Sequence, residues 1–121
     1  FTLAHFLLSQ LSAKSNDLAK AQDEAIAVAQ LAPEEPLAWY NLGLILYTRK
    51  SYDGAVSALQ RAVQLQGNYA NALFVLGLSY YELGQESDAI ASFNQVAILN
   101  PEDPLPKKAV TNVKAGRNPL K

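Results

Sequence analysis

The stretch WYNLGLIL at residues 39–46 has a counterpart, LFVLGLSY, at residues 73–80. Both stretches carry a Leu-Gly-Leu core, with the glycines at Gly43 and Gly77. Glycine inside a helix costs about 1 kcal/mol relative to alanine, so its repetition indicates a place where two helices approach too closely for a side chain. The spacing of about 34 residues between the two copies predicts a chain built from similar helical units.

Further columns align at the same shift, and prolines at positions 33 and 101 lie two periods apart with Gly67 midway between them. We expect the aligned alanines to face the two glycines from the second helix of each pair. Large apolar side chains would then fill the space around that contact, namely Leu42, Leu59, Leu76 and Phe93. The aligned columns are Leu8, Leu42 and Leu76; Ala21, Ala55 and Ala89; and Phe6, Tyr40 and Phe74.

These residues resemble the tetratricopeptide repeat, whose pattern is Trp-x2-Leu-Gly-x2-Tyr, then Ala-x3-Phe, then Pro. The third copy reads Leu73-x2-Leu76-Gly77-x2-Tyr80, then Ala89-x3-Phe93, then Pro101. The middle copy begins Trp39-x2-Leu42-Gly43, and the first departs furthest, with His5 at the tryptophan position. The resemblance implies an all-α fold, an α-solenoid in which antiparallel helix pairs form a right-handed superhelix. It divides a single domain, 1–121, into repeats 2–35, 36–69 and 70–103, a capping helix 104–116 and a tail 117–121.

Proline and glycine positions predict the helix boundaries. Pro36 and Pro104 suit the first turn of a helix, where a missing N–H costs nothing. Gly84 suits a left-handed C-cap, and Ser51 suits an N-cap. The helices are expected near residues 3–13, 17–31, 36–49, 52–66, 70–83, 86–99 and 104–115.

The composition excludes several classes of protein. Half of the 121 residues are hydrophobic, and the formal net charge of −1 argues against a nucleic-acid partner. No apolar run is long enough to enter and cross a bilayer. The sequence leaves the compartment unknown; the cytoplasm is the first expectation, and a soluble domain of an envelope protein is the second. The chain has no methionine and begins with an apolar segment, 1–11, so we expect a piece of a longer or processed polypeptide.

No residue pattern indicates an active site, so we expect no enzyme, no cofactor and no metal. Cysteine is absent, and His5 is the only histidine and takes a packing position of the repeat. The acidic pairs Glu34-Glu35 and Glu102-Asp103 fall in equivalent turns before helices, where carboxylates are favoured by the helix dipole.

The resemblance implies that the first helix of each pair lines a concave groove that binds another protein or a peptide. Chaperone-binding members of the family hold a carboxylate with cations and asparagines; of the corresponding positions here only Asn41 matches, which excludes that ligand. The predicted binding residues are Phe6, Gln10, Leu37, Tyr40, Asn41, Leu44, Tyr47, Asn71, Phe74, Leu78 and Tyr81. Tyr40 and Phe74 have an alternative role, which is packing between adjacent first helices.

The sequence leaves three functions open, and none is catalytic. The first is a scaffold that binds an apolar peptide or helix in the groove. The second is self-association into a homo-oligomer. The third is a C-terminal regulatory or packing domain of a larger, membrane-tethered bacterial protein, because residues 112–120 are similar to tails of repeat domains in envelope-polysaccharide membrane proteins.

Overall fold

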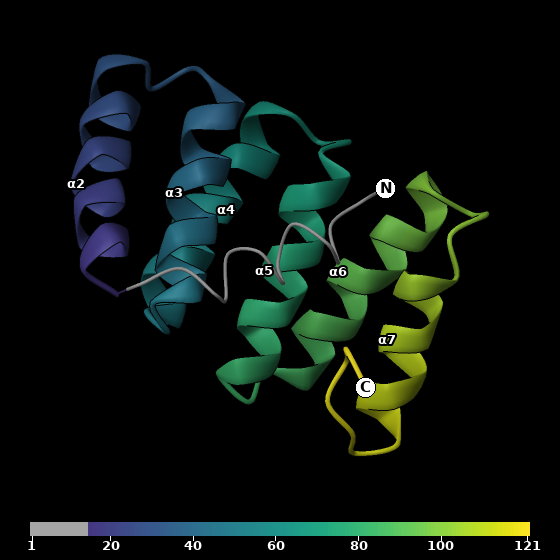
Figure 1. Ribbon diagram of the computed structural model, residues 1–121. Coiled ribbons are helices and arrows are strands. Elements are labelled where there is room, and N and C mark those ends of the chain that lie inside the picture. The colour runs from purple at the N-terminus through teal and green to yellow at the C-terminus, as the bar shows by residue number, and fades with distance from the viewer. Residues whose placement is uncertain (1–14) are drawn as a thin grey trace.

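The computed structural model describes residues 15–121, in which six helices and no strand occur. The helices stand side by side in chain order (Figure 1). Each begins and ends within two residues of its predicted bounds, which confirms the all-α repeat fold. The expected helix at 3–13, together with His5, lies outside the described residues. The observed helices are α2 (Ser15–Leu31), α3 (Pro36–Thr48), α4 (Tyr52–Leu65), α5 (Ala70–Glu82), α6 (Glu86–Leu99) and α7 (Pro104–Lys114).

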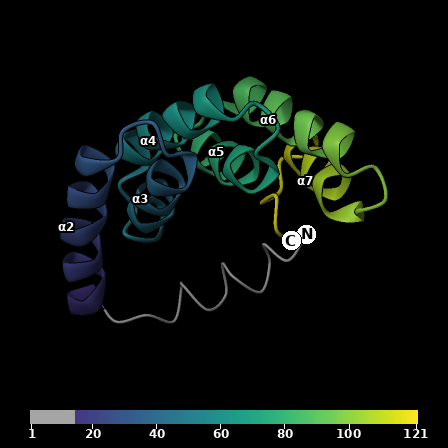
Figure 2. The same ribbon diagram turned by 90° about the horizontal axis from the view of Figure 1, so that it is seen from above.

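Seen from above, the described helices follow an arc (Figure 2). Helices α3, α5 and α7 lie on its inner side, whereas α4 and α6 lie on the outer side. Each helix packs against the next one in the chain, and α3 also contacts α5. The inner helices therefore present a row of similar faces, as in other solenoids whose repeats contact only their neighbours.

Helix α5 forms the centre of the core, because every residue from 72 to 79 is buried. The buried Ser79 hydroxyl donates to the Val75 carbonyl oxygen at 2.8 Å. This polar group therefore has a hydrogen-bond partner although it is shielded from water. At the C-terminal end, α7 buries Ala109 and Val113 and leaves Lys107, Lys108 and Lys114 exposed. This amphipathic pattern suits a helix that covers the end of the stack.

The two helical glycines allow close contact with a large side chain of the following helix. A Cβ added to Gly43 would lie 2.5 Å from Cγ of Leu59, and one added to Gly77 would lie 2.6 Å from Cε1 of Phe93. The side chains nearest to the glycines are therefore Leu59 and Phe93, which were expected around this contact, and not the alanines. The nearest neighbours are the residues one helical turn after Ala55 and Ala89, because the larger side chains at those positions cover the glycine surface.

Turn chemistry sets the ends of the helices. Pro36 and Pro104 take the predicted first-turn positions, and Asp103 Oδ1 accepts from the Leu105 N–H at 2.9 Å. Ser51 takes the N-cap position of α4, but its side chain donates and accepts no capping hydrogen bond.

The predicted left-handed cap at Gly84 is confirmed by a φ of 78°. Lys50, one period earlier, has a φ of 66° that the sequence did not predict. An equivalent backbone hydrogen bond closes each turn: the Ser51 N–H donates to the Leu46 carbonyl at 2.8 Å, and the Gln85 N–H donates to the Tyr80 carbonyl at 2.9 Å. Lys50 therefore accepts a conformation that costs a non-glycine residue about 1–2 kcal/mol.

The glycine contact predicts the effect of one added methyl group. Gly77→Ala should lower the free energy of unfolding by about 1–3 kcal/mol through overpacking against the fully buried Phe93 ring, although alanine favours the helix. Gly54→Ala is the matched control, because its nearest neighbour is the end of the half-buried Leu46 side chain at 3.3 Å. Urea unfolding measures both, and equal midpoints for Gly77→Ala and the wild type would contradict the assigned contact.

Candidate interaction surface

The predicted binding residues differ widely in accessibility. Leu37 is 52% exposed and Asn41 is exposed, whereas Tyr47, Asn71 and Tyr81 are half-buried. Phe6 and Gln10 lie outside the described residues. Four further predicted residues are buried and present almost no surface to a partner in this conformation: Tyr40, Leu44, Phe74 and Leu78.

Two of the buried residues are held by ring contacts within the stack. The Tyr40 ring lies 5.1 Å from the Tyr69 ring, and the Phe74 ring lies 5.1 Å from the Phe93 ring. Both distances are typical of stabilising aromatic pairs. Burial, and then the neighbouring Tyr69, raises the pKa of Tyr40 well above its usual value. These contacts correspond to the packing role that the sequence offered for Tyr40 and Phe74.

A second aromatic pair joins Tyr47 at the end of α3 to Tyr52 at the start of α4, with ring centroids 5.6 Å apart. Burial is the main cause that raises the pKa of Tyr47, followed by the Glu82 carboxylate and Tyr52. The pKa of Tyr52 is raised by burial and then by Glu82. The phenol of Tyr47 is therefore held neutral beside an acidic side chain of α5.

The cleft between α2 and α3 is the recess that includes predicted binding residues. It has a volume of about 340 Å³. Asn41 and Leu44 were predicted from the sequence, whereas the other lining residues were not. The lining consists of Ala21, Glu24, Ala25 and Val28 from α2, and of Ala38, Asn41, Leu44 and Ile45 from α3.

The spacing of the α2 residues explains why one helix supplies half of this cleft. Ala21, Ala25 and Val28 recur at intervals of four and three residues, which places them on one helix face. That helical period was the signal available in the sequence, where Ala21 was assigned only to a packing column. Val28 is 51% exposed, so the cleft keeps apolar surface open to solvent. Next to it, Arg49 Nη1 donates to Gln22 Oε1 at 2.6 Å and ties the end of α3 to α2.

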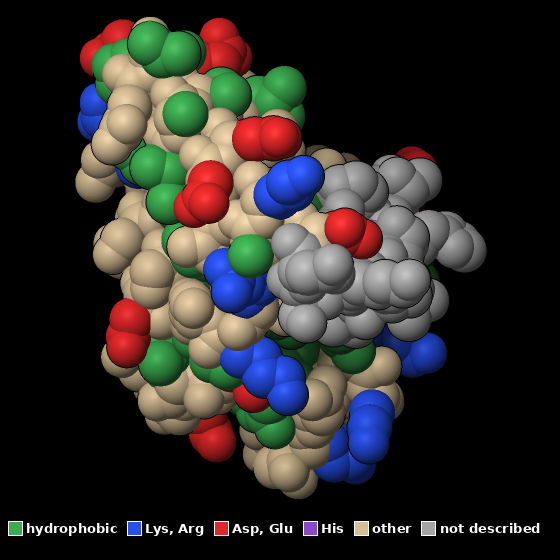
Figure 3. Space-filling view, turned by 60° about the vertical axis from the view of Figure 1, so that its left-hand side comes forward, with side chains coloured by type: hydrophobic (Ala, Val, Ile, Leu, Met, Phe, Trp, Pro, Cys, Tyr) green, Lys and Arg blue, Asp and Glu red, His purple; other side chains and the backbone are tan. Residues whose placement is uncertain are grey.

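Apolar side chains are also exposed where α2 ends and the chain turns into α3 (Figure 3). Leu31 there is 86% exposed, and Leu37 follows the turn. Acidic and basic side chains are mixed over the rest of this face, without a large patch of one sign (Figure 3). The accessible surface at this end of the arc is therefore apolar in places, and residues 15–38 carry five acidic side chains and one basic side chain.

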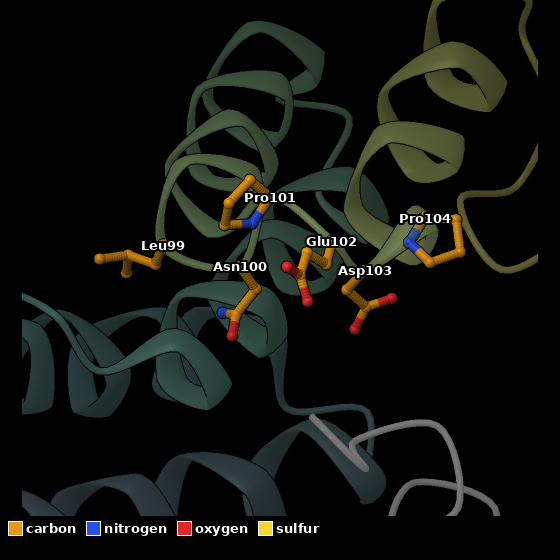
Figure 4. A pocket seen from close by; sticks show the side chains of 6 residues that line it. All are labelled: Leu99, Asn100, Pro101, Glu102, Asp103 and Pro104. Carbon is orange, nitrogen blue, oxygen red and sulfur yellow. The ribbon is translucent and has the colours of Figure 1, made fainter.

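Another recess, of about 580 Å³, borders a single turn between α6 and α7. Asn100, Glu102 and Asp103 direct their side chains to one side of this turn (Figure 4). Asp103 already caps α7, and no three His, Asp, Glu or Cys side chains gather as a metal site anywhere in residues 15–121. The acidic side chains of this turn thus lie at the start of α7, where the helix dipole favours a negative charge, as the sequence predicts.

Two models of the tetratricopeptide repeat match the chain, one over residues 6–70 and the other over residues 46–113. The chain belongs to the tetratricopeptide repeat family. Proteins of this family are generally non-catalytic interaction scaffolds. No helix in the described part of this tetratricopeptide repeat chain is long and apolar enough to cross a membrane.

Known proteins that are similar to this tetratricopeptide repeat chain include a human protein and a solved structure. The PEX5-related protein of Homo sapiens is 33% identical over 70 residues, which cover 58% of this chain and 11% of that protein. The solved structure of MamA superposes with a TM-score of 0.79 at 25% identity, and the match covers 82% of this chain and 58% of that one. The chain therefore spans only part of the length of each protein.

The environment of Tyr47 predicts a dependence of stability on alkaline pH. A raised pKa in the folded state stabilises the fold below the unfolded value of about 10, and this stability is lost as the pH rises above it. Over one pH unit above 10, the wild type should lose about 1 kcal/mol more than Tyr47→Phe. Urea unfolding at about pH 9 and about pH 11 measures the difference. Equal losses in the two proteins would show that Tyr47 is not held neutral in the fold.

Proposed function

We propose that this chain is a non-catalytic scaffold that binds an apolar peptide or helix of another protein in the cleft between α2 and α3. The main support for this proposal is the cleft itself, because its volume of about 340 Å³ is within the range of ligand-binding clefts in proteins. Family membership supports a protein partner.

The lining suits a helical or extended apolar ligand. Ala21, Ala25 and Ala38 carry only a methyl group, so the ligand backbone can come close to both helices. Val28 and Ile45 supply larger apolar contacts beside them. An amphipathic helix that places its apolar face in such a groove is a recurrent mode of peptide recognition.

Two polar side chains in the lining favour a particular orientation of the ligand. Glu24 and Asn41 are exposed, and they come from opposite helices of the cleft. Asn41 can donate to and accept from a peptide group, and Glu24 can accept a hydrogen bond from a lysine or arginine. Because Glu24 is exposed, the cation adds orientation more than affinity. The half-buried predicted residues Tyr47, Asn71 and Tyr81 are proposed to extend the contact along the inner side.

A charge placed in the cleft should remove binding. Peptides selected from a displayed random library against the wild-type chain are expected to be apolar on one face, and Val28→Asp should weaken them at least about ten-fold, since a carboxylate then loses its water in the complex. The half-exposed position allows the variant to fold. Leu120→Asp is the matched control, because Leu120 is 42% exposed and lies in the tail.

Fluorescence anisotropy of the labelled peptides measures these affinities, and circular dichroism checks that both variants keep their helices. Peptides that bind Val28→Asp as tightly as the wild type would place their site elsewhere. Weakening by both variants alike would also remove the cleft from the proposal.

Self-association is a second candidate, and the exposed Leu31 and Leu37 side chains favour it. In that arrangement the end of α2 would be buried against a second copy, most simply about a two-fold axis. Light scattering across a wide concentration range tests it. A constant molar mass near 13.1 kDa would remove this candidate, whereas a dimer disrupted by Leu31→Asp would support it.

A further inference from the structure

The turns that precede α3, α5 and α7 have the same backbone hydrogen bonds, one repeat period apart. In the first hydrogen bond of each turn, the N–H groups of Ala32, Gln66 and Asn100 donate at 2.8, 2.9 and 2.9 Å to carbonyls four residues earlier. The second bond, from Glu35, Tyr69 and Asp103, spans three residues at 3.1, 3.2 and 3.1 Å. The three turns can therefore be compared residue by residue.

One carbonyl of this turn is bonded by a side chain in two of the three cases. Trp39 Nε1 donates to the Pro33 carbonyl at 2.9 Å, and Lys107 Nζ donates to the Pro101 carbonyl at 3.4 Å. Each donor follows its acceptor by six residues. In the middle turn the acceptor is Gly67 and the residue six positions later is Leu73, whose side chain has no donor.

The Gly67 carbonyl accepts no hydrogen bond from any residue in the described range 15–121. A Cβ built on Gly67 would also meet nothing within 4 Å. The turn is therefore open on this side. The carbonyls of Pro33 and Pro101 are bonded by side chains of the same chain, whereas the Gly67 carbonyl is free to accept a hydrogen bond from an external donor.

A recess of about 190 Å³ lies beside Gly67 and Leu73. It is lined by Gly67 and Leu73 with the last turns of α6, and its walls are mostly apolar: Gly67, Leu73, Gln95, Ile98 and Leu99. Ile98 is 77% exposed and Leu99 is 40% exposed, so two large apolar side chains border an unfilled space.

The preceding repeat has an indole at the position equivalent to Leu73. One period earlier, the lining positions are Pro33, Trp39, Arg61, Gln64 and Leu65. The Trp39 indole is partly buried against the core there, and Arg61 Nη2 reaches Glu34 Oε1 at 3.7 Å. This backbone therefore already holds one indole whose N–H bonds the turn carbonyl and whose ring packs against the core.

We propose that the recess at Leu73 is a docking site for a tryptophan side chain of a partner protein. The indole ring contacts Leu73, Ile98 and Leu99, and its N–H donates to the Gly67 carbonyl oxygen. Size is consistent with this ligand, because an apolar cavity of about 150 Å³ already holds a benzene ring. Tryptophan is also among the residues that most often anchor protein interfaces. This site is separate from the α2/α3 cleft, and its test does not depend on a ligand of that cleft.

The experiment titrates N-acetyl-tryptophanamide and free indole into the isotope-labelled chain and follows the backbone amide resonances. The resonances of the recess, at Gly67, Leu73, Gln95, Ile98 and Leu99, should shift with a dissociation constant on the order of 1 mM. 1-Methylindole, which has no N–H, should bind roughly two- to ten-fold more weakly. Equal affinities for indole and 1-methylindole would overturn the role of the Gly67 carbonyl.

Two variants test the recess from opposite directions. Leu73→Trp supplies an internal indole and should weaken N-acetyl-tryptophanamide binding at least about ten-fold, with the new N–H bonded to Gly67 as in the preceding repeat. Ile98→Asp should weaken binding similarly without touching the buried core, which keeps the test valid if Leu73→Trp does not fold. Leu120→Asp is the control and should bind as the wild type does.

Wild-type affinity in the folded Ile98→Asp variant would contradict the proposal. Shifts confined to residues outside the recess would contradict it as well. Binding of free indole without binding of N-acetyl-tryptophanamide would show that the recess admits no side chain carried on a peptide backbone. If peptides did not bind the α2/α3 cleft, these results would be unaffected. The two proposed sites are therefore tested independently.

Discussion

The close fit of a glycine against a large side chain sets the geometry of the helix pairs. Gly43 receives Leu59 and Gly77 receives Phe93, and neither site has room for a Cβ atom. This contact fixes how near the two helices of a pair can lie. Its repetition in successive repeats then stacks the pairs with equivalent faces inward. The arc and the inner row of helices follow from that spacing.

Much of the fold was predictable because prolines, glycines and the repeat period mark the helix ends. The period gives the members of a column but not their rotation about the helix axis, so it does not tell which side chain of the second helix lies nearest to each glycine. The left-handed Lys50 was missed for another reason. Its conformation is imposed by the hydrogen bonds of the turn, and lysine carries no compositional signal for it.

The candidate site was less predictable, because a column in a repeat can serve either the core or the surface. Asn41 and Leu44 lie on an inner helix and line the cleft, although only Asn41 is exposed, whereas Tyr40 and Phe74 at similar positions are buried and lie outside the lining. The contribution of α2 depends on how its alanine face meets α3, which one helix period does not reveal. Differences between repeats carry more information: tryptophan against leucine at 39 and 73, and proline against glycine at 33 and 67. Together they mark the second recess.

The central claim is that an apolar segment of another protein binds between α2 and α3. Amide chemical-shift mapping of the isotope-labelled chain with a selected peptide tests it most directly, because the resonances of each helix are observed separately. We expect shifts concentrated at 21–28 and 38–45, with little change at residues of α6 and α7. Shifts concentrated on the outer helices α4 and α6, with residues 21–28 unaffected, would contradict it.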